Sequence, residues 1–358
     1  MSLQSLGWNA RFETLFSSHR ERSLVPARVA REDRDRYVVL DESGARSAGL
    51  AGRLRHEARS RAELPAVGDW VAVRPGAASS DVAVVEAVLP RTSAFVRKVA
   101  GETTEEQIVA ANVDTLFLVS GLDDDFNPRR IERYLAAAWE SGAEPVVVLN
   151  KSDLAGDLDA LVAAAEASAP GVAVVPLSAL AGDPAGALAR WLVPGRTGAF
   201  VGSSGGGTST LVNALLGEVR QATGEVREDD SRGRHTTTHR ELLPLAGGAV
   251  LVDTPGMREL QLWGGEESLD GAFPDVTELA ARCRFGDCLH ASEPGCAVLA
   301  AIEEGTLDPA RLDSWRKLQR ELRWLATRSN ARLRSAEEAK WKQIHQSMKH
   351  HPKAHRWR

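Results

Sequence analysis

The feature that most constrains the fold is a series of short apolar runs in the middle of the chain, separated by helix-like segments. Runs such as Thr115–Val119 and Pro145–Leu149 are apolar without alternation, as is typical of strands covered on both faces of a parallel sheet. Between them, Pro128–Gly142 begins after Asn127 and ends at a glycine, a pattern that predicts a helix. The alternation predicts a doubly wound α/β domain over residues 101–268.

Residues 1–100 follow a different pattern, with short strand-like runs and turns at close spacing. Leu24–Val29, Arg36–Leu40 and Trp70–Val73 are three of these runs, and Asp41–Gly44 is a turn signal. The spacing predicts a five-stranded β-barrel. Its length and position fit the oligonucleotide-binding type, although a purely structural barrel is equally compatible with the pattern.

The composition excludes several classes of protein. With 43% hydrophobic and 26% charged residues, the chain of 358 residues is neither disordered nor collagen-like. No run approaches the ~18 apolar residues of a membrane span, and Met1–Arg20 lacks the pattern of a secretory signal. We therefore expect a cytoplasmic protein of two or three domains without a membrane partner, and we expect it to be a monomer.

The charge is distributed unevenly along the chain. Fourteen Lys or Arg and four Asp or Glu lie between Arg311 and Arg358, whereas the whole chain carries −5. A basic tail on an acidic body indicates an anionic partner, with nucleic acid favoured over a membrane. A solvated amphipathic helix without a specific partner explains the charge equally well.

The first chemical motif, Asn150-Lys151-Ser152-Asp153, comes directly after an apolar run. A carboxylate such as Asp153 can accept two hydrogen bonds from the N1 and N2 edge of guanine, and adenine offers no such pair of donors. Asn150 and Lys151 would brace the loop and cover the base. A surface turn is the alternative, but ligands of α/β domains bind at such strand ends.

The second motif is a glycine-rich segment between an apolar run and a helix pattern. Its backbone N–H groups would surround phosphates at a helix N-terminus, and the alternative is a flexible linker. The phosphate-loop pattern has a lysine at position 208, whereas this chain has a threonine. The hydroxyl of Ser209 occupies the position that binds Mg²⁺ in such loops. The segment consists of Gly202, Ser203, Ser204, Gly205, Gly206, Gly207, Thr208, Ser209 and Thr210.

Three further segments complete a nucleotide site. Asp253-Thr254-Pro255-Gly256 follows another apolar run. Asp253 would reach Mg²⁺ through water, and the N–H of Gly256 would contact a γ-phosphate. The alternative is a simple turn. Residues 233–238 form a polar run with the threonines of a mobile switch. Ser178 and Ala179 match a weak guanine-loop signature.

The order of these motifs is unusual. In ordinary GTPases the phosphate loop comes first, whereas here the guanine loops at 150 and 178 precede the phosphate loop at 202. Such an order indicates a circular permutation, which the proximity of domain termini permits. It also puts the two switch segments, residues 223–240 and 253–262, immediately before residues 269–358, the predicted C-terminal domain.

All three cysteines fall within one short loop. Cys283, Cys288, His290 and Cys296 lie within fourteen residues, and a Cys₃His set is typical of a closed structural zinc site, one per chain. The alternative is three free cysteines with an incidental histidine.

Together, the permuted order, the three-domain layout and the Cys-x4-Cys-x-His-x5-Cys spacing make the chain similar to the RsgA family of circularly permuted GTPases. The resemblance also covers Leu64–Val71, Leu89–Arg91 and Ala110–Asp114. It implies an oligonucleotide-binding barrel, a GTPase domain and a helical zinc domain. It further implies GTP and GDP as ligands with Mg²⁺, and the 30S ribosomal subunit with its 16S rRNA as partner, released after GTP hydrolysis late in maturation.

Two positions bear on the chemistry. Met257 stands where many GTPases have a water-orienting glutamine; the resemblance implies His235 as the catalytic residue instead, although His235 could equally contact only RNA or solvent. Thr208 removes the ammonium that contacts the β- and γ-phosphates, so we expect weak GTP binding and slow hydrolysis. The alternatives are a non-hydrolysing 30S assembly factor with a degenerate GTPase scaffold, and a GTPase directed at tRNA or DNA.

Overall fold

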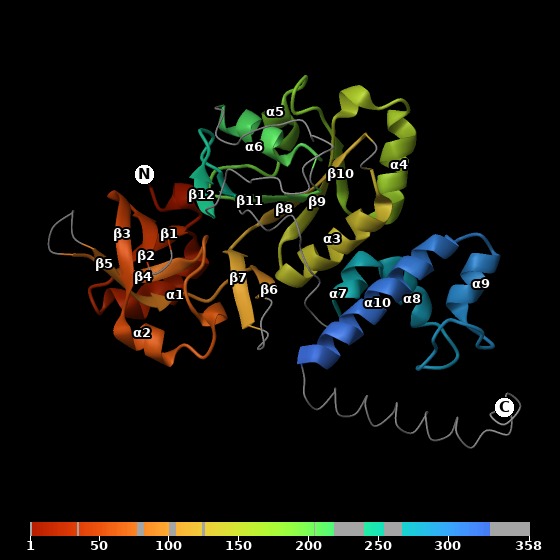
Figure 1. The fold of residues 1–358 in the computed structure, drawn as a ribbon, viewed down its shortest axis with the longest axis horizontal. Coiled ribbons are helices and arrows are strands. Elements are labelled where there is room, and N and C mark those ends of the chain that lie inside the picture. The colour runs from red at the N-terminus through yellow and green to blue at the C-terminus, as the bar shows by residue number, and fades with distance from the viewer. Residues whose placement is uncertain are drawn as a thin grey trace, which may run out of the picture. The chain divides into compact units, whose positions relative to one another are not determined.

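The computed structural model forms two compact units, Met1–Gln261 and Leu262–Arg358 (Figure 1). A barrel and an α/β sheet both belong to the first unit, so a division at residue 100 stays a prediction. The residues described below are 2–33, 36–76, 82–99, 105–123, 126–203, 205–217, 240–253 and 267–329.

The N-terminal part of the first unit is a closed five-stranded barrel, which confirms the predicted fold. Each strand pairs with its neighbour in the order β1-β2-β3-β5-β4, and β4 closes the barrel by pairing antiparallel with β1. The strands β3 and β5 are parallel, and the other pairs are antiparallel. The strands are β1 Val25–Asp33, β2 Arg36–Asp41, β3 Gly44–Leu50, β4 Trp70–Arg74 and β5 Ala83–Val88.

Aliphatic side chains fill the barrel, and an aromatic cluster covers one end. Val29, Val39 and Val85 are fully buried inside. At the end, Trp8 packs edge-on against Trp70 at 4.7 Å between ring centroids. The remaining elements of this part are η1 Gln4–Leu6, α1 Ala10–Arg20, α2 Gly52–Glu57 and η2 Arg61–Glu63.

A hairpin leads from the barrel into the α/β sheet. Its strands are β6 Ala94–Val99 and β7 Glu105–Ala111, which pair antiparallel. The α/β sheet has the order β10-β9-β8-β11-β13-β12, in which β12 alone of these described strands is antiparallel to its neighbour. Its strands are β8 Thr115–Gly121, β9 Glu144–Asn150, β10 Ala173–Pro176, β11 Thr197–Gly202, β12 Glu241–Pro244 and β13 Val250–Asp253.

Helices cover the α/β sheet as the apolar runs predicted. The helix α3 packs against β8 and β9, and α6 packs against β11 and α5. Phe117 on β8 stacks on Phe200 of β11 at 4.8 Å between ring centroids within this core. The helices, with a short η3 at Ser152–Leu154, are α3 Pro128–Ser141, α4 Leu158–Ser168, α5 Pro184–Leu188 and α6 Thr208–Leu216.

The barrel and the α/β sheet are hydrogen-bonded into one continuous sheet of eleven strands. The junction is antiparallel pairing of β1 with β12, at the register Arg31 opposite Glu241. The barrel is therefore attached directly to the sheet that carries the predicted nucleotide motifs.

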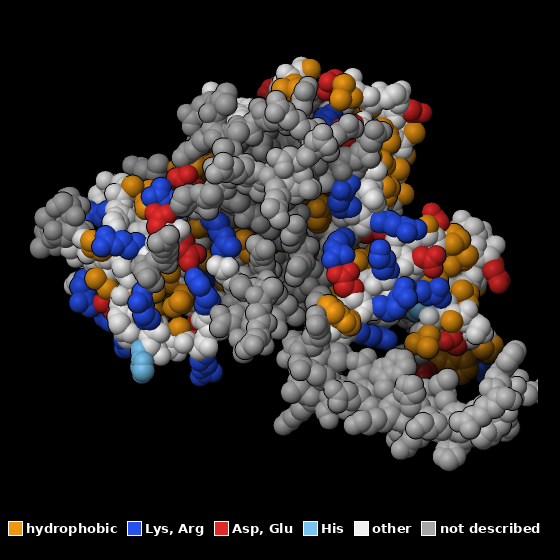
Figure 2. All heavy atoms as spheres, in the orientation of Figure 1, with side chains coloured by type: hydrophobic (Ala, Val, Ile, Leu, Met, Phe, Trp, Pro, Cys, Tyr) orange, Lys and Arg blue, Asp and Glu red, His pale blue; other side chains and the backbone are white. Residues whose placement is uncertain are grey.

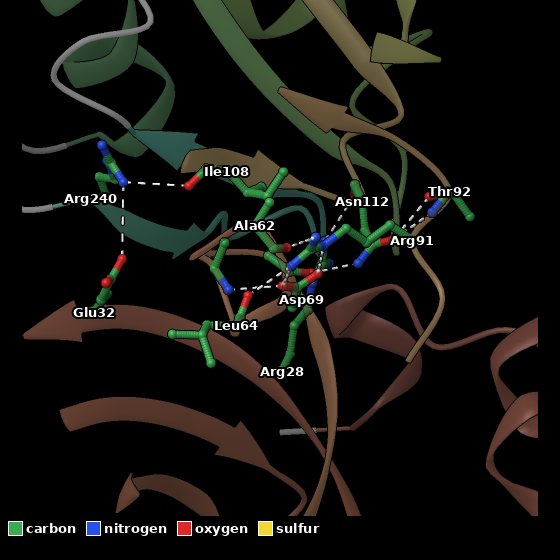
Figure 3. Close-up of polar contacts among 12 residues, drawn as sticks. Arg28, Glu32, Ala62, Leu64, Asp69, Arg91, Thr92, Ile108, Asn112 and Arg240 are labelled. Atoms are coloured by element: carbon green, nitrogen blue, oxygen red, sulfur yellow. Dashed lines mark hydrogen bonds and ion pairs between the residues drawn. The ribbon is translucent and has the colours of Figure 1, made fainter. Parts of the chain in front are cut away.

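A buried polar cluster fixes the barrel to the segments that lead into the α/β sheet (Figure 3). The Asp69 carboxylate is fully buried and accepts hydrogen bonds from Arg91 Nε at 2.8 Å and Nη2 at 2.7 Å. Arg28 donates to the carbonyl oxygens of Gly68 at 3.1 Å and Asn112 at 3.0 Å, and also to that of Leu6. Burial lowers the pKa of Arg28 to about 10, so the guanidinium stays charged at neutral pH.

Gly68 is required for this close approach. Its φ is +93°, and a Cβ at this position would lie 2.1 Å from the carbonyl oxygen of Ala111. Any side chain would therefore push the barrel away from the end of β7.

Replacing Arg91 with alanine is expected to lower the free energy of unfolding by about 3–5 kcal/mol, because the Asp69 carboxylate would remain buried without its bidentate partner. Urea denaturation of the two proteins measures the difference. The control is Arg74→Ala, which removes a pair with Glu86 from a side chain that is 64% exposed, and it should cost about 1 kcal/mol or less. Equal effects of the two substitutions would contradict the prediction.

The second unit consists of short helices around a cysteine loop. Its helices are α7 Glu267–Ala272, α8 Pro274–Ala280, α9 Ala297–Glu303 and α10 Pro309–Ser329. Buried Arg311 links α10 to the start of α8: Nε donates to Asp275 at 2.9 Å, and the guanidinium lies 4.3 Å from the ring centroid of Phe273. Across the described ranges of both units, none of the helices combines the length and the apolar character needed to cross a bilayer.

Candidate nucleotide and metal sites

The carboxyl ends of five parallel strands meet at one edge of the α/β sheet. They are Gly121, Asn150, Pro176, Gly202 and Asp253, the last residues of β8, β9, β10, β11 and β13. Because ligands of open α/β sheets bind at this edge, the structure brings the strand-end motifs of the sequence to a common place.

Asn150 fastens three of the predicted motifs together. Its side chain is 2% exposed, and Nδ2 donates to the carbonyl oxygen of Gly206 at 3.0 Å. Its Oδ1 accepts from the backbone N–H of Ala179 at 3.0 Å. The predicted guanine loop, the glycine-rich loop and the loop at 178 are therefore held together by one amide.

Lys151, directly after Asn150, is half-buried. Lys151 has a positive φ of 63°, and its ammonium pairs with the carboxylate of Asp123. Asp153 is exposed within η3, so its carboxylate is accessible to a base. Ser178 is buried, and its Oγ accepts from the N–H of Ala181 at 3.0 Å.

Asp123 is a further charged residue of this edge, and no sequence motif marks it. It follows β8 and reaches Lys151 of the predicted guanine loop only in the folded sheet. The signal was the polar run after the apolar strand Thr115–Val119, which has no motif of its own.

The glycine-rich segment has the backbone of a cradle. A Cβ at Gly202 would lie 2.6 Å from the carbonyl oxygen of Val119, and one at Gly207, whose φ is +85°, would lie 2.2 Å from Asn150 Nδ2. Both positions require glycine. Gly207 is also the N-cap of α6 and contributes no side chain to cap its N–H groups, which leaves the helix start suited to an anion. A loose linker would not impose these restrictions.

Thr208 is the first residue of α6. Its Oγ1 is buried without a hydrogen-bond partner in the described residues, and a Cβ at Gly202 would lie 3.1 Å from it. The hydroxyl therefore lies close to Gly202, the last residue of β11. Ser209 and Thr210 follow in the first turn of α6, half-buried.

Asp253 ends β13, with Glu241 opposite it in the β12–β13 ladder. Of the remaining predicted site residues, Gly205 and Ser203 lie within the described part of the loop. Three predicted site residues fall outside the described residues: Ser204, His235 and Gly256. Of the two predicted switch segments, only Arg240 and Asp253 are described.

The four predicted metal ligands come together between α8 and α9. One donor atom each from Cys283, Cys288, His290 and Cys296 lies within 4.8 Å of the others. The Sγ atoms of Cys283 and Cys296 are 3.8 Å apart, and His290 Nδ1 lies 3.6 Å from the first and 3.4 Å from the second. A tetrahedron with Zn–S bonds of about 2.3 Å has edges of about 3.8 Å, so the cluster fits a tetrahedral metal ion.

The loop that carries the histidine is held by its own hydrogen bonds. Glu293 accepts from the backbone N–H groups of Leu289, Ala291 and Ser292 at 2.8–3.0 Å, and the hydrogen bonds from these amides lower the pKa of Glu293 to about 2. Burial lowers the pKa of His290, which favours the neutral imidazole that binds metal.

Comparison with known proteins agrees with this architecture. The family model "RsgA GTPase" matches residues 88–263. A protein of Opitutus terrae, named small ribosomal subunit biogenesis GTPase RsgA, is 53% identical over 357 residues, covering 98% of this chain and 97% of its own.

Two solved structures share the fold. YjeQ from Thermotoga maritima superposes with a TM-score of 0.64 at 28% identity, over 84% of this chain and 98% of its own. YloQ, described as a circularly permuted GTPase, has a TM-score of 0.60 at 24% identity, over 84% and 95%.

The fold and the order of its motifs are those of a circularly permuted GTPase. The identity over nearly the whole chain is specific to one group of these enzymes: the chain belongs to the RsgA GTPase family. The predictions of the fold class, the permutation and the family are thereby confirmed.

Proposed function

We propose that this protein binds guanine nucleotides at the carboxyl edge of its parallel sheet and acts as a GTPase in maturation of the small ribosomal subunit. The observation that carries the proposal is the buried amide of Asn150, which joins the glycine-rich loop to the loop at Ala179. This amide fixes the proposed phosphate loop, at Gly206, against the proposed base-reading loop, at Ala179, as binding of one nucleotide across both loops requires.

Guanine recognition rests on Asp153, whose exposed carboxylate can accept from N1 and N2 of the base. Replacing Asp153 with asparagine puts donors opposite donors, and we expect the affinity for GDP to fall by about 100-fold or more. The affinity for xanthosine diphosphate should rise, because xanthine carries a carbonyl where guanine carries its amino group.

Isothermal titration calorimetry with both nucleotides, on the native protein and on the variant, measures this change in base preference. The matched control is Asp157→Asn, because Asp157 caps α4 through the N–H of Ala160 and lies outside the motif. Unchanged preference for GDP in the Asp153 variant would exclude the proposed base contact.

The phosphate groups would lie over the glycine-rich loop at the start of α6. Ser209 and Asp253 are the residues that would hold Mg²⁺, which supplies charge stabilisation to the phosphates when it is bound. His235 is proposed to orient the attacking water, with the N–H of Gly256 contacting the γ-phosphate. Thr208 provides no ammonium, so we propose that GTP binding is weak and turnover slow in this chain.

The metal of the cysteine loop is proposed to be one structural Zn²⁺ per chain. Three thiolates and one imidazole match the ligands that Zn²⁺ prefers, and four protein ligands leave no open position for a substrate. The metal would therefore stabilise the second unit and take no part in hydrolysis.

The proposed partner is the 30S subunit with its 16S rRNA, as the name of the relative from Opitutus terrae suggests. The barrel offers a basic surface suited to phosphates, visible where α2 lies in Figure 2. We call it the α2 surface; its basic members are the exposed side chains Arg53, Arg55, His56, Arg59 and Arg61, and Glu57 and Glu63 are exposed among them. Such a partner implies a cytoplasmic protein, and the fold suggests that it acts as a monomer.

Sedimentation with purified 30S subunits, in GDP and in a non-hydrolysable GTP analogue, tests the proposal. We expect binding that is stronger with the GTP analogue, and no comparable binding to tRNA or duplex DNA. Binding that ignores the nucleotide would favour the second candidate, a non-hydrolysing assembly factor, which the missing lysine at position 208 supports.

A further inference from the structure

One carboxylate on the barrel lies between two arginines that face different parts of the molecule. Glu32, near the end of β1, has Oε1 at 3.5 Å from Arg61 Nη2 and Oε2 at 4.0 Å from Arg240 Nη1. Arg61 belongs to the α2 surface, whereas Arg240 directly precedes β12 (Figure 3). Glu32 therefore connects the barrel surface to the α/β sheet.

Arg240 is part of the junction between the two sheets. Its Nη1 lies 3.5 Å from the carbonyl oxygen of Ile108, and its Nη2 lies 3.4 Å from Oε1 of Gln107, both on β7. These distances are at the long end for hydrogen bonds. The guanidinium of Arg240 therefore lies between Glu32 of the barrel and two acceptors of β7.

The junction leads directly to the predicted Mg²⁺ ligand. Arg31 lies opposite Glu241, and Glu241 lies opposite Asp253, in adjacent ladders of one sheet. A change that tightens the β1–β12 junction therefore acts on β12, which is paired with the strand that carries Asp253. Every residue of this path lies within the described ranges.

The two pairs of Glu32 differ in exposure. The Arg61 side chain is 53% exposed, whereas Arg240 and Glu32 are both 17% exposed. An exposed pair is weak and easily replaced by another anion, whereas a half-buried pair is less screened by solvent. A phosphate that binds Arg61 would therefore leave Glu32 to pair with Arg240 alone.

We propose that RNA phosphate binding at Arg61 releases Glu32 to Arg240 and so tightens the β1–β12 junction, which raises the affinity of the Asp253 side of the nucleotide site for GTP. This relay rests on the proposed function, since it requires both an RNA partner and a guanine nucleotide. By linkage, the nucleotide raises the affinity for RNA by the same factor.

The relay predicts opposite effects for the two arginines. We expect purified 30S subunits to raise the affinity of the native chain for a fluorescent, non-hydrolysable GTP analogue by about fivefold or more. Arg61→Ala should reach the higher affinity without 30S subunits and gain less than twofold from them. Arg240→Ala and the nearly isosteric Glu32→Gln should stay at the lower affinity in both conditions, and Arg61→Ala combined with Arg240→Ala should do the same.

The matched control is Arg53→Ala, since Arg53 lies on the α2 surface but pairs with Glu57 at 3.7 Å rather than with Glu32. Arg53→Ala should weaken 30S binding while keeping the fivefold response at saturating 30S. If Arg61→Ala behaves as the native chain, or Arg240→Ala keeps the response while both ligands bind, the relay is wrong. Absence of nucleotide or 30S binding in the native chain would instead overturn the proposed function, and the relay with it.

Discussion

Replacing Thr208 with lysine is expected to raise GTP turnover by about 10²–10³-fold, the factor associated with one charge-stabilising donor in a transition state. The affinity for GTP should rise by about 10–100-fold, since one hydrogen bond to a charged group contributes roughly 1.5–3 kcal/mol. This is the largest effect on activity that we expect from any single substitution in the chain.

The structure explains why threonine does not substitute for the ammonium. A threonine hydroxyl is short and uncharged, and that of Thr208 lies buried close to Gly202 without a described partner. The cradle itself keeps the glycines at 202 and 207 and the brace from Asn150. A lysine at 208 would therefore find the rest of the phosphate site in place.

Single-turnover hydrolysis with excess enzyme, together with GTP and GDP titrations, measures both effects. Thr208→Met is the control, because it adds a long side chain at the same position without a charge. Native protein that already binds tightly and turns over as fast as Thr208→Lys would show that another cation serves the phosphates.

Removing the metal is expected to unfold the second unit while the first unit stays folded. Apparent binding free energies of roughly 10–16 kcal/mol are typical of structural zinc sites, and a unit of this size cannot replace such a contribution. The helices α7, α8 and α9 have only six or seven residues each, too few to be stable alone. The cysteine loop connects α8 to α9, so a metal bound there would fix the two helices against each other.

Limited proteolysis and circular dichroism before and after chelation, with elemental analysis of the released metal, test this. Cys296→Ser should reproduce the effect of the chelator, whereas Leu289→Ala, at an exposed position in the same loop, should leave the unit folded. A chelated protein that keeps its helices and its protease resistance would contradict a structural role for the metal. Release of a metal other than zinc would correct the proposed identity.

The parts of the fold that the sequence predicted are those with a periodic apolar signal. The buried strands β8 and β9 are apolar along their length, so both were expected, and the helix Pro128–Ser141 begins at its Asn-Pro cap as predicted. In contrast, β3 has a single fully buried side chain, Ala48. A strand with so little apolar surface leaves no alternation to detect, and its existence depends on pairing with β2 and β5.

The candidate site divides in the same way. Motifs with a local spacing, such as the Cys₃His set and the residues around Asn150, could be found along the chain because their members are close in sequence. Asp123 and the Arg28, Asp69 and Arg91 cluster depend on contacts between distant segments, which a single sequence does not reveal. His235 lies outside the described residues, and its catalytic role stays a prediction.

GTP hydrolysis with and without purified 30S subunits tests the central claim most directly, namely that this permuted GTPase fold serves the small ribosomal subunit. The account predicts slow hydrolysis by the native chain, a clear increase with 30S subunits, and a much larger 30S-stimulated rate in the Thr208→Lys variant. Hydrolysis that 30S subunits fail to stimulate in both proteins, despite tight guanine nucleotide binding, would contradict it.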